Sequence, residues 1–127
     1  MKLIFVILLN VPMFLLSAQD RYSAFDVIAK GNVNALASQF DNHIELCFNG
    51  KIQILEKEAA SNALKGFLEQ NQPKTCTSIH KGSSKSNESQ YLIGQLTTTS
   101  GKFFRVYIYF EDIDGKSIIQ ELRIDKE

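Results

Sequence analysis

The sequence lacks an excess of charge of either sign, and it lacks metal-ligating or nucleophilic residues at a spacing typical of a functional site. Fourteen basic side chains balance fourteen acidic ones, so no overall field draws nucleic acid or an anionic membrane to the surface. The two histidines and two cysteines do not have the ligand-pair spacing of a zinc site. We therefore expect no nucleic-acid partner, no bound metal and no cofactor.

What the chain does contain is the composition of a folded domain. Hydrophobic residues make up 44% and charged residues 22% of the chain. These values are close to the average of soluble globular proteins, which argues against disorder and against a wholly membrane-embedded chain. A chain of 127 residues suits one domain and is too short for two domains with separate cores.

The amino terminus departs from this average. Lys2 gives it a positive charge, and Asn10 is the only polar side chain between Leu3 and Leu16. The run is about half a dozen residues shorter than the ~20 needed to span a bilayer, and it ends in Leu16-Ser17-Ala18, which is typical of a cleavage site. We predict a signal peptide over residues 1–18 and one exported domain over 19–127, periplasmic or secreted and free of the membrane after cleavage. A retained anchor helix is the alternative.

Export places Cys47 and Cys76 in an oxidising compartment, where a disulfide persists. A bridge requires Cα atoms within ~7 Å, and the hydrophobic pattern places the two cysteines on strands that are not neighbours. We therefore predict two free, partly buried thiols, with a disulfide as the alternative. Neither thiol has a base beside it in the pattern, so a nucleophilic role is not expected.

Hydrophobic periodicity predicts helices in the first half of the domain. Apolar residues at helical spacing indicate short helices over 22–28 and 33–40, separated by Gly31-Asn32. Residues 41–49 alternate as a half-buried strand does, and Asn49-Gly50 is a strong hairpin signal. The returning strand leads into a third helix, which ends at Asn71-Gln72-Pro73.

Four runs with a period of two follow, over residues 74–81, 90–98, 103–111 and 117–125, and they predict a meander. In the last two runs, one face carries the apolar residues that are expected to meet the helices. These are Phe104, Val106, Ile108 and Phe110, together with Ile118, Gln120, Leu122 and Ile124. A slip or bulge of one residue would exchange the two faces.

The order of helix, helix, hairpin, helix and four antiparallel strands resembles the nuclear transport factor 2-like superfamily, a cystatin-like α+β cone that includes ketosteroid isomerase. Four segments further resemble a domain-of-unknown-function family of small exported bacterial proteins: Ile79-His80-Lys81-Gly82-Ser83-Ser84, Gln90-Tyr91-Leu92-Ile93-Gly94, Phe104-Arg105-Val106-Tyr107-Ile108-Tyr109 and Ile119-Gln120-Glu121-Leu122-Arg123-Ile124. The resemblance implies a curved antiparallel sheet of about five to six strands wrapped around three helices. It implies no activity, because this fold hosts enzymes, adaptors and binding modules.

Two candidate surfaces follow from this fold. The first is an apolar cavity in the cone for a small apolar molecule, with a filled core as the alternative. Its candidate residues are Tyr22, Phe25, Phe67, Phe104, Phe110 and Gln120.

The second candidate surface is the outer face of the sheet, where tyrosine and arginine are residue types that dominate interfaces. Its candidate residues are Arg105, Tyr107, Tyr109, Ile119, Glu121 and Arg123. The resemblance implies a homodimer formed through this face. A monomer whose tyrosine rings lie against arginine stems is the alternative.

We therefore predict an exported, non-catalytic binding or protein-interaction module. An isomerase or hydratase on this fold is the alternative, and it requires a carboxylate deep in the apolar cone. The inward rows of the last two strands offer only Gln120 as a polar side chain. A protease-inhibitor-like protein ranks third, because a helix cradled by an antiparallel sheet also describes cystatins, whose Gln-x-Val-x-Gly signature is absent here.

Overall fold

The computed structural model describes residues 16–85 and 88–127, with side chains described from Ser23 onward. The predicted signal peptide lies outside these parts, except for the backbone of residues 16–18, and the side chain of Tyr22 lies outside them as well. Within the described parts, no helix has the length and apolar character needed to cross a membrane.

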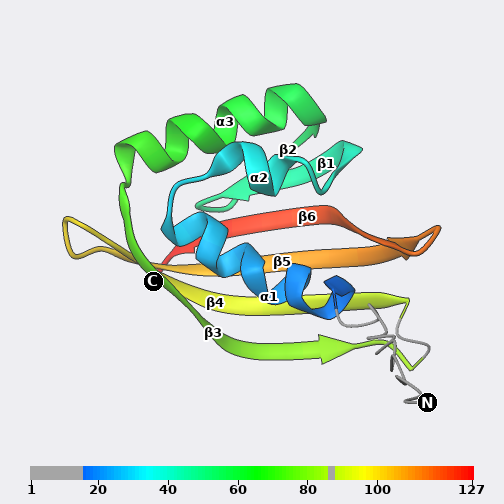
Figure 1. Ribbon diagram of the computed structural model, residues 1–127. Coiled ribbons are helices and arrows are strands. Elements are labelled where there is room, and N and C mark those ends of the chain that lie inside the picture. Colours follow the sequence, from blue (N-terminus) through cyan, green and yellow to red (C-terminus); the bar gives the residue numbers. More distant parts are fainter. Residues whose placement is uncertain (1–15, 86–87) are drawn as a thin grey trace, which may run out of the picture.

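Three helices cover one side of the sheet (Figure 1). They are α1 (Leu16–Ala29), α2 (Val33–Ala37) and α3 (Lys57–Gln70). Helix α1 ends because Gly31 adopts a left-handed φ of 66°, which a residue without Cβ does at little cost. The N–H groups of Gly31 and Asn32 then donate to the carbonyls of Ile28 and Val27, at 2.9 and 3.0 Å.

The sheet has six strands in the order β2-β1-β6-β5-β4-β3. They are β1 (Phe40–Phe48), β2 (Lys51–Glu56), β3 (Pro73–Ser83), β4 (Ser89–Thr98), β5 (Phe103–Ile113) and β6 (Lys116–Lys126). Strands β3 to β6 form the predicted meander. The pairing of β1 with β6 is parallel and the other neighbouring pairs are antiparallel. The predicted curved sheet is thus mostly antiparallel, with one parallel pair.

The sheet curves around the helices, and Figure 1 shows α1 lying across β4 and β3 while α3 and α2 cover β1 and β2. The predicted hairpin turn at Asn49-Gly50 is confirmed by its positive φ angles of 50° and 82°, which suit a type I′ turn. The third helix ends where it was predicted to end. Phe40, expected in a helix, is the first residue of β1.

One hydrophobic core lies between the helices and the inner face of the sheet. The predicted inward row of β5 is confirmed, since Phe104, Val106, Ile108 and Phe110 are each at most 2% exposed. The helices contribute Ala24, Phe25, Ile28, Val33, Leu36, Ala37, Ala60, Leu64 and Leu68 to the same core. Cys47 and Cys76 are free and buried, as predicted, and three strands separate β1 from β3 in the sheet.

A β-bulge in β6 corrects the predicted faces of that strand. Tyr109 pairs with Glu121 but Phe110 pairs with Ile119, so Gln120 is the extra residue on β6. A bulge inserts one residue and thereby exchanges the faces on one side of it. Ile119, expected on the outer face, is therefore fully buried in the core, and Gln120 sits in the bulge instead of in the predicted inward row.

Candidate functional site

The side of the sheet that faces away from the helices, called the outer face below, carries a group of tyrosines at its centre. The register places Tyr91 of β4 opposite Tyr109 of β5, and all three tyrosines, Tyr91, Tyr107 and Tyr109, are half-buried. The rings of Tyr91 and Tyr107 have centroids 6.0 Å apart. The ring of Tyr91 also covers Gly82 of β3, where an added Cβ would lie 2.3 Å from it. Glycine at position 82 thus lets the ring lie flat against the edge strand.

An ion pair lies beside these tyrosines on β6. The guanidinium of Arg123 donates a hydrogen bond to the carboxylate of Glu121, and this bond raises the pKa of Arg123. Tyr107 pairs across strands with Arg123, as Tyr109 does with Glu121. Burial, and next the charge of Glu121, raise the pKa of the Tyr107 phenol. The Tyr107 phenol therefore stays a neutral hydrogen-bonding group at physiological pH.

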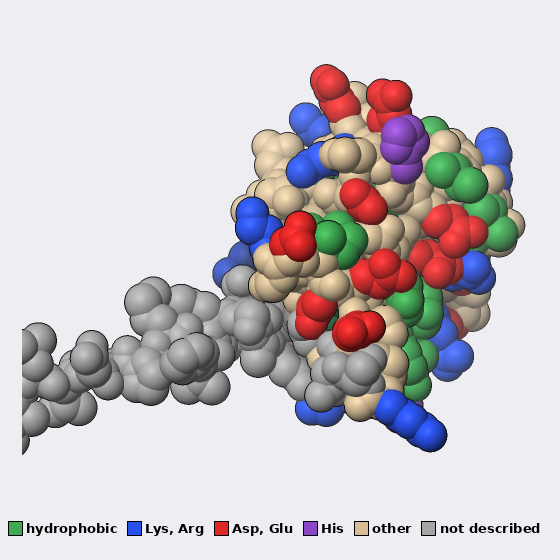
Figure 2. All heavy atoms as spheres, turned by 90° about the vertical axis from the view of Figure 1, so that its right-hand side faces the viewer, with side chains coloured by type: hydrophobic (Ala, Val, Ile, Leu, Met, Phe, Trp, Pro, Cys, Tyr) green, Lys and Arg blue, Asp and Glu red, His purple; other side chains and the backbone are tan. Residues whose placement is uncertain are grey.

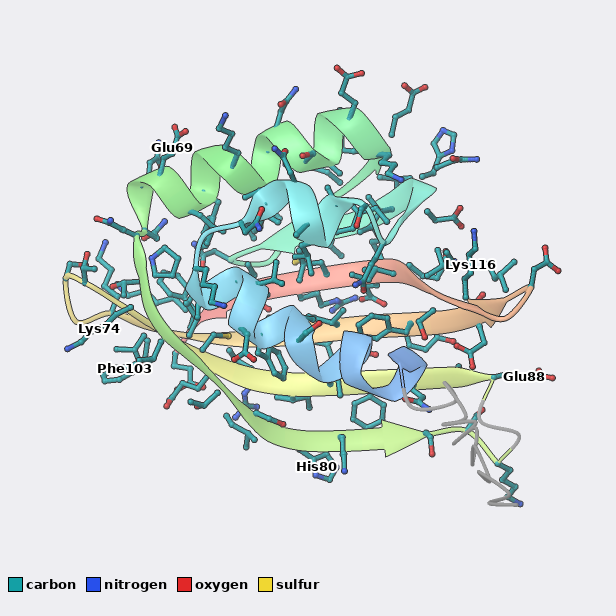
Figure 3. All side chains as sticks on the ribbon, in the orientation of Figure 1. Glu69, Lys74, His80, Glu88, Phe103 and Lys116 are labelled. Atoms are coloured by element: carbon teal, nitrogen blue, oxygen red, sulfur yellow. The ribbon has the colours of Figure 1, made fainter. Side chains whose placement is uncertain are left out.

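Apolar side chains extend the outer face toward its margins. Ile52 and Ile54 on the edge strand β2 are 54% and 74% exposed, and they pair with Cys47 and Glu45 of β1. Phe103, at the opposite corner in Figure 3, is 49% exposed. Large exposed apolar side chains on one sheet face are typical of an interaction surface.

The structure brings five of the six predicted interface residues together on the outer face, namely Arg105, Tyr107, Tyr109, Glu121 and Arg123. Only Ile119 is excluded, by the bulge. Sequence reasoning missed Tyr91, Ile93, Ile52 and Ile54. Their alternation with buried residues was visible in the sequence, but their membership of this face follows from the strand register, which a single sequence does not reveal.

Four of the six predicted cavity residues, the phenylalanines, belong to the packed core or lie against it, whereas Gln120 sits in the bulge and the side chain of Tyr22 lies outside the described parts. Phe67 stacks on Phe48, with ring centroids 4.5 Å apart, and meets Phe104 edge-on at 5.4 Å. Phe25 and Phe110 are 3% and 1% exposed, and Phe25 packs directly against Gly94. These described side chains fill the interior between helices and sheet, as the filled-core alternative expects.

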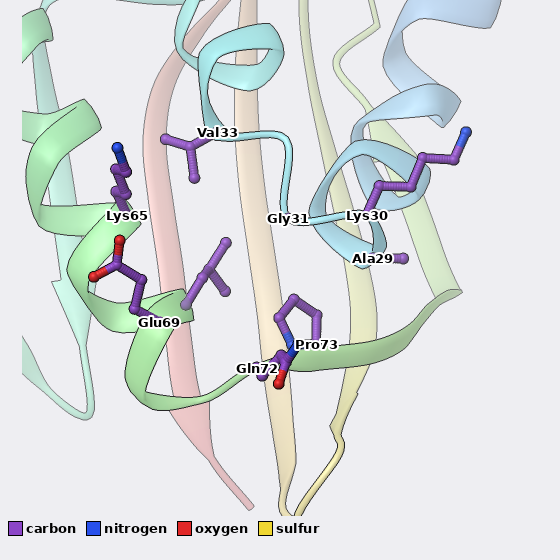
Figure 4. Close-up of a pocket in the computed structure, with 9 residues that line it drawn as sticks. Ala29, Lys30, Gly31, Val33, Lys65, Glu69, Gln72 and Pro73 are labelled. Carbon is purple, nitrogen blue, oxygen red and sulfur yellow. The ribbon is translucent and has the colours of Figure 1, made fainter.

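A pocket that sequence reasoning missed, called the end pocket below, lies where α1 and α3 end (Figure 4). Its volume is about 390 Å³. It is lined by Ala29, Lys30, Gly31, Val33, Lys65, Leu68, Glu69, Gln72 and Pro73. Three chain segments contribute to it, so no local motif could have revealed it.

The described interior contains little ionisable chemistry. Thr98 is the polar side chain found buried among the described residues. Burial, followed by the charge of Asp26, raises the pKa of the Cys76 thiol to about 12, so this thiol is not a nucleophile near neutral pH. In residues 16–85 and 88–127, no three His, Cys, Asp or Glu side chains are grouped so that they could hold a metal.

Comparison with known families shows to which protein family the chain belongs. The family described as Domain of unknown function (DUF4783) matches residues 22–125. The chain belongs to the DUF4783 family. A solved DUF4783 protein from Bacteroides ovatus is 27% identical, with a TM-score of 0.77, and the match covers 83% of this chain and 93% of that one.

More distant solved structures share the fold of this DUF4783 chain. An NTF-2 like protein of unknown function from Shewanella oneidensis is 14% identical, with a TM-score of 0.61, over 85% of this chain and 94% of that one. A protein of unknown function with a cystatin-like fold from Nostoc punctiforme is 13% identical, with a TM-score of 0.65, over 92% and 93%. The predicted family is thus confirmed, and the chain has the predicted nuclear transport factor 2-like, cystatin-like fold.

No curated protein matches this DUF4783 chain. Family membership and fold together name no substrate, partner or reaction. The features of this DUF4783 protein that bear on its function are therefore its own outer face and end pocket.

Proposed function

We propose that this DUF4783 protein is an exported, non-catalytic interaction module whose outer face binds a second copy of the same chain. The observation that carries the proposal is the group of half-buried Tyr91, Tyr107 and Tyr109 on a sheet face that none of the described helices covers. Tyrosine buries a large area at a low cost in side-chain entropy and keeps a hydroxyl for hydrogen bonds. Such groups form the centres of interfaces.

The size of the face suits a dimer. Six strands spaced by about 4.8 Å, over about nine residues of about 3.3 Å each, give a flat footprint of about 700 Å². A stable interface needs about 800 Å² of accessible surface from each partner. Protruding side chains such as Ile52 and Phe103 make the accessible area larger than this footprint.

The charges on the face favour a second copy over a strongly charged partner. Glu45 lies opposite Glu121 across the β1–β6 junction, Arg123 follows along β6, and the other end of the strands carries Arg105 together with Asp125 and Glu127. Carboxylates and arginines thus alternate along the face, so a second copy turned end over end about a two-fold axis perpendicular to the strands meets a surface of mixed charge. Such mixed charges do not favour a strongly charged partner.

The alternatives gain less support. An isomerase or hydratase on this fold requires an ionisable group in the interior, and Thr98 is the polar side chain buried among the described residues. A protease-inhibitor-like role has no hairpin signature to support it. We therefore keep the interaction module as the proposed function.

Native mass spectrometry of the protein purified from an exporting host tests the proposal. We expect the mass of a chain that has lost its first eighteen residues, and a dimer at micromolar concentration. Tyr107→Lys places an unpaired charge at the centre of the face and should yield monomers, whereas Glu58→Lys on exposed α3 should leave the dimer unchanged. A wild-type protein that stays monomeric, or a Tyr107→Lys variant that stays dimeric, contradicts the proposed interface.

A further inference from the structure

The end pocket has apolar walls below its opening and charged side chains around the opening. Val33 of α2 and Leu68 of α3 are 7% and 6% exposed, and together with Pro73 they form apolar walls beneath the opening. Figure 4 shows Lys65 and Glu69 on one side of the mouth and Lys30 on the other. A concave apolar site with a few polar groups at its mouth is the usual form of a small-molecule site.

The lysines at the rim are available to a ligand. Lys30 and Lys65 are exposed, and neither ammonium forms a hydrogen bond or ion pair within the described parts of the chain. The nearby helix ends already have donors for their carbonyls. Gly31 and Asn32 donate to the end of α1, and the backbone and side chain of Asn71 both donate to Phe67 in α3. Local donors thus reduce the negative potential that helix C-termini otherwise create.

The two ends of the molecule differ in charge. At the opposite end of the sheet, a second pocket of about 380 Å³ is lined by Glu88, Glu111 and Asp112 along with serines and Tyr109. Acidic side chains gather on that end in Figure 2. An anion is therefore repelled from the acidic end, whereas the end pocket carries two lysines against one glutamate.

We propose that the end pocket binds a small monocarboxylate with a short apolar body. The apolar part would lie on Val33, Leu68 and Pro73, and the carboxylate would lie at the mouth. The side chains of Lys30 and Lys65, which point outward from opposite sides in Figure 4, would turn toward it on binding. The rim has two positive charges and one negative charge, so a single negative charge neutralises it. The site lies on the helix side of the sheet, away from the outer face, so the proposal is independent of dimer formation.

Three probes of equal length test the class of ligand. Hexanoate, 1-hexanol and hexylammonium each contain six carbon atoms and differ in head-group charge. In amide NMR titrations of the purified protein, we expect hexanoate to bind most tightly and to shift the signals of Gly31, Val33 and Leu68. Equal affinity for hexanol, preference for hexylammonium, or shifts confined to other regions would each overturn the proposal.

Variants locate the head group. Lys30→Gln and Lys65→Gln should each weaken hexanoate binding about threefold, as expected for an exposed charge pair, and should leave hexanol binding unchanged. Lys116→Gln, on the β5–β6 hairpin at the far end, is the matched control and should change nothing. Ala29→Leu should fill the pocket and abolish binding, with the remaining amide spectrum reporting an intact fold. Undiminished binding in the double lysine variant would refute the assignment.

Discussion

The two faces of the sheet are made by the same strands, yet they differ in how completely they are buried. On β5, Phe104, Val106 and Ile108 face the helices and are at most 2% exposed. Their neighbours Tyr107 and Tyr109 face outward and are half-buried. The inner face is closed by the chain's own helices, whereas the outer face keeps aromatic area that no element within residues 16–85 and 88–127 covers.

This difference indicates that the inward and outward residues of the strands serve two separate purposes. The inner row provides the free energy of folding, because the hydrophobic effect follows the apolar area removed from water. The outer row contributes less to folding than its size suggests, because its rings remain partly in water. Substitutions on the two faces should therefore separate stability from association.

The largest contrast is expected between Phe104→Ala and Tyr107→Ala. Truncating the buried Phe104 leaves a cavity beside Phe67 and should lower the free energy of unfolding by about 3–5 kcal/mol. Truncating Tyr107 should cost about 1–2 kcal/mol. Urea unfolding at a concentration where the protein is monomeric measures both values. Equal losses would mean that the two faces contribute alike to folding.

A smaller effect is expected at Gly94, where α1 approaches the inner face of β4. A Cβ at this position would lie 2.7 Å from the ring of Phe25 and 2.8 Å from the backbone oxygen of Thr77. Gly94→Ala should therefore destabilise by about 1–3 kcal/mol through overpacking.

Gly66 is the matched control for Gly94, because it lies within α3 and a Cβ there meets nothing within 4 Å. Gly66→Ala should stabilise the protein by up to about 1 kcal/mol, since alanine favours a helix interior. Thermal unfolding of the two variants should shift the midpoint in opposite directions. Two shifts of the same sign would refute the close approach of Phe25.

The most gradual effect concerns Cys76, whose thiol points into the buried side of β3. Its pKa is raised from 9.0 to about 12 in the folded protein. Above pH 9 the unfolded chain loses this proton while the folded chain keeps it, so the unfolded state binds fewer protons. The free energy of unfolding should fall as the pH rises from about 9 to 12, by at most about 1.4 kcal/mol per pH unit.

Urea unfolding of wild type and Cys76→Ala across this pH range measures the contribution of Cys76, because other groups titrate in both proteins. We expect a shallower decline in the variant. Rapid labelling of the wild-type Cys76 by a thiol reagent at pH 8 without denaturant would contradict its burial.

Much of the fold could be predicted from the sequence because each element carries its own period. The alternation of residues 103–111 identified both faces of β5, and Asn49-Gly50 identified a turn that only a few residue pairs favour. The bulge at Gln120 could not be predicted, since it depends on how β6 fits between β1 and β5. Because Ile118 and Ile119 are adjacent and equally apolar, the sequence supports either choice of inward residue.

The candidate site was predicted in part for the same reason. The outward row of β5 and the Glu121–Arg123 pair follow from alternation alone. Ile52 and Ile54 join that face only through the pairing of β1 with β6, and the end pocket forms only where α1, α3 and β3 meet. Such sites depend on contacts between distant parts of the chain, which local periodicity does not encode.

The parallel pairing of β1 with β6 also sets the timing of folding. Strand β1 lies next to the last strand of the chain, so the β1–β2 hairpin has no neighbour in the sheet until residues 116–126 have been synthesised. Contacts between sequence-distant strands form slowly because a long loop must close first. A chain that lacks residues 116–126 therefore cannot complete its sheet, and its hydrophobic core stays open.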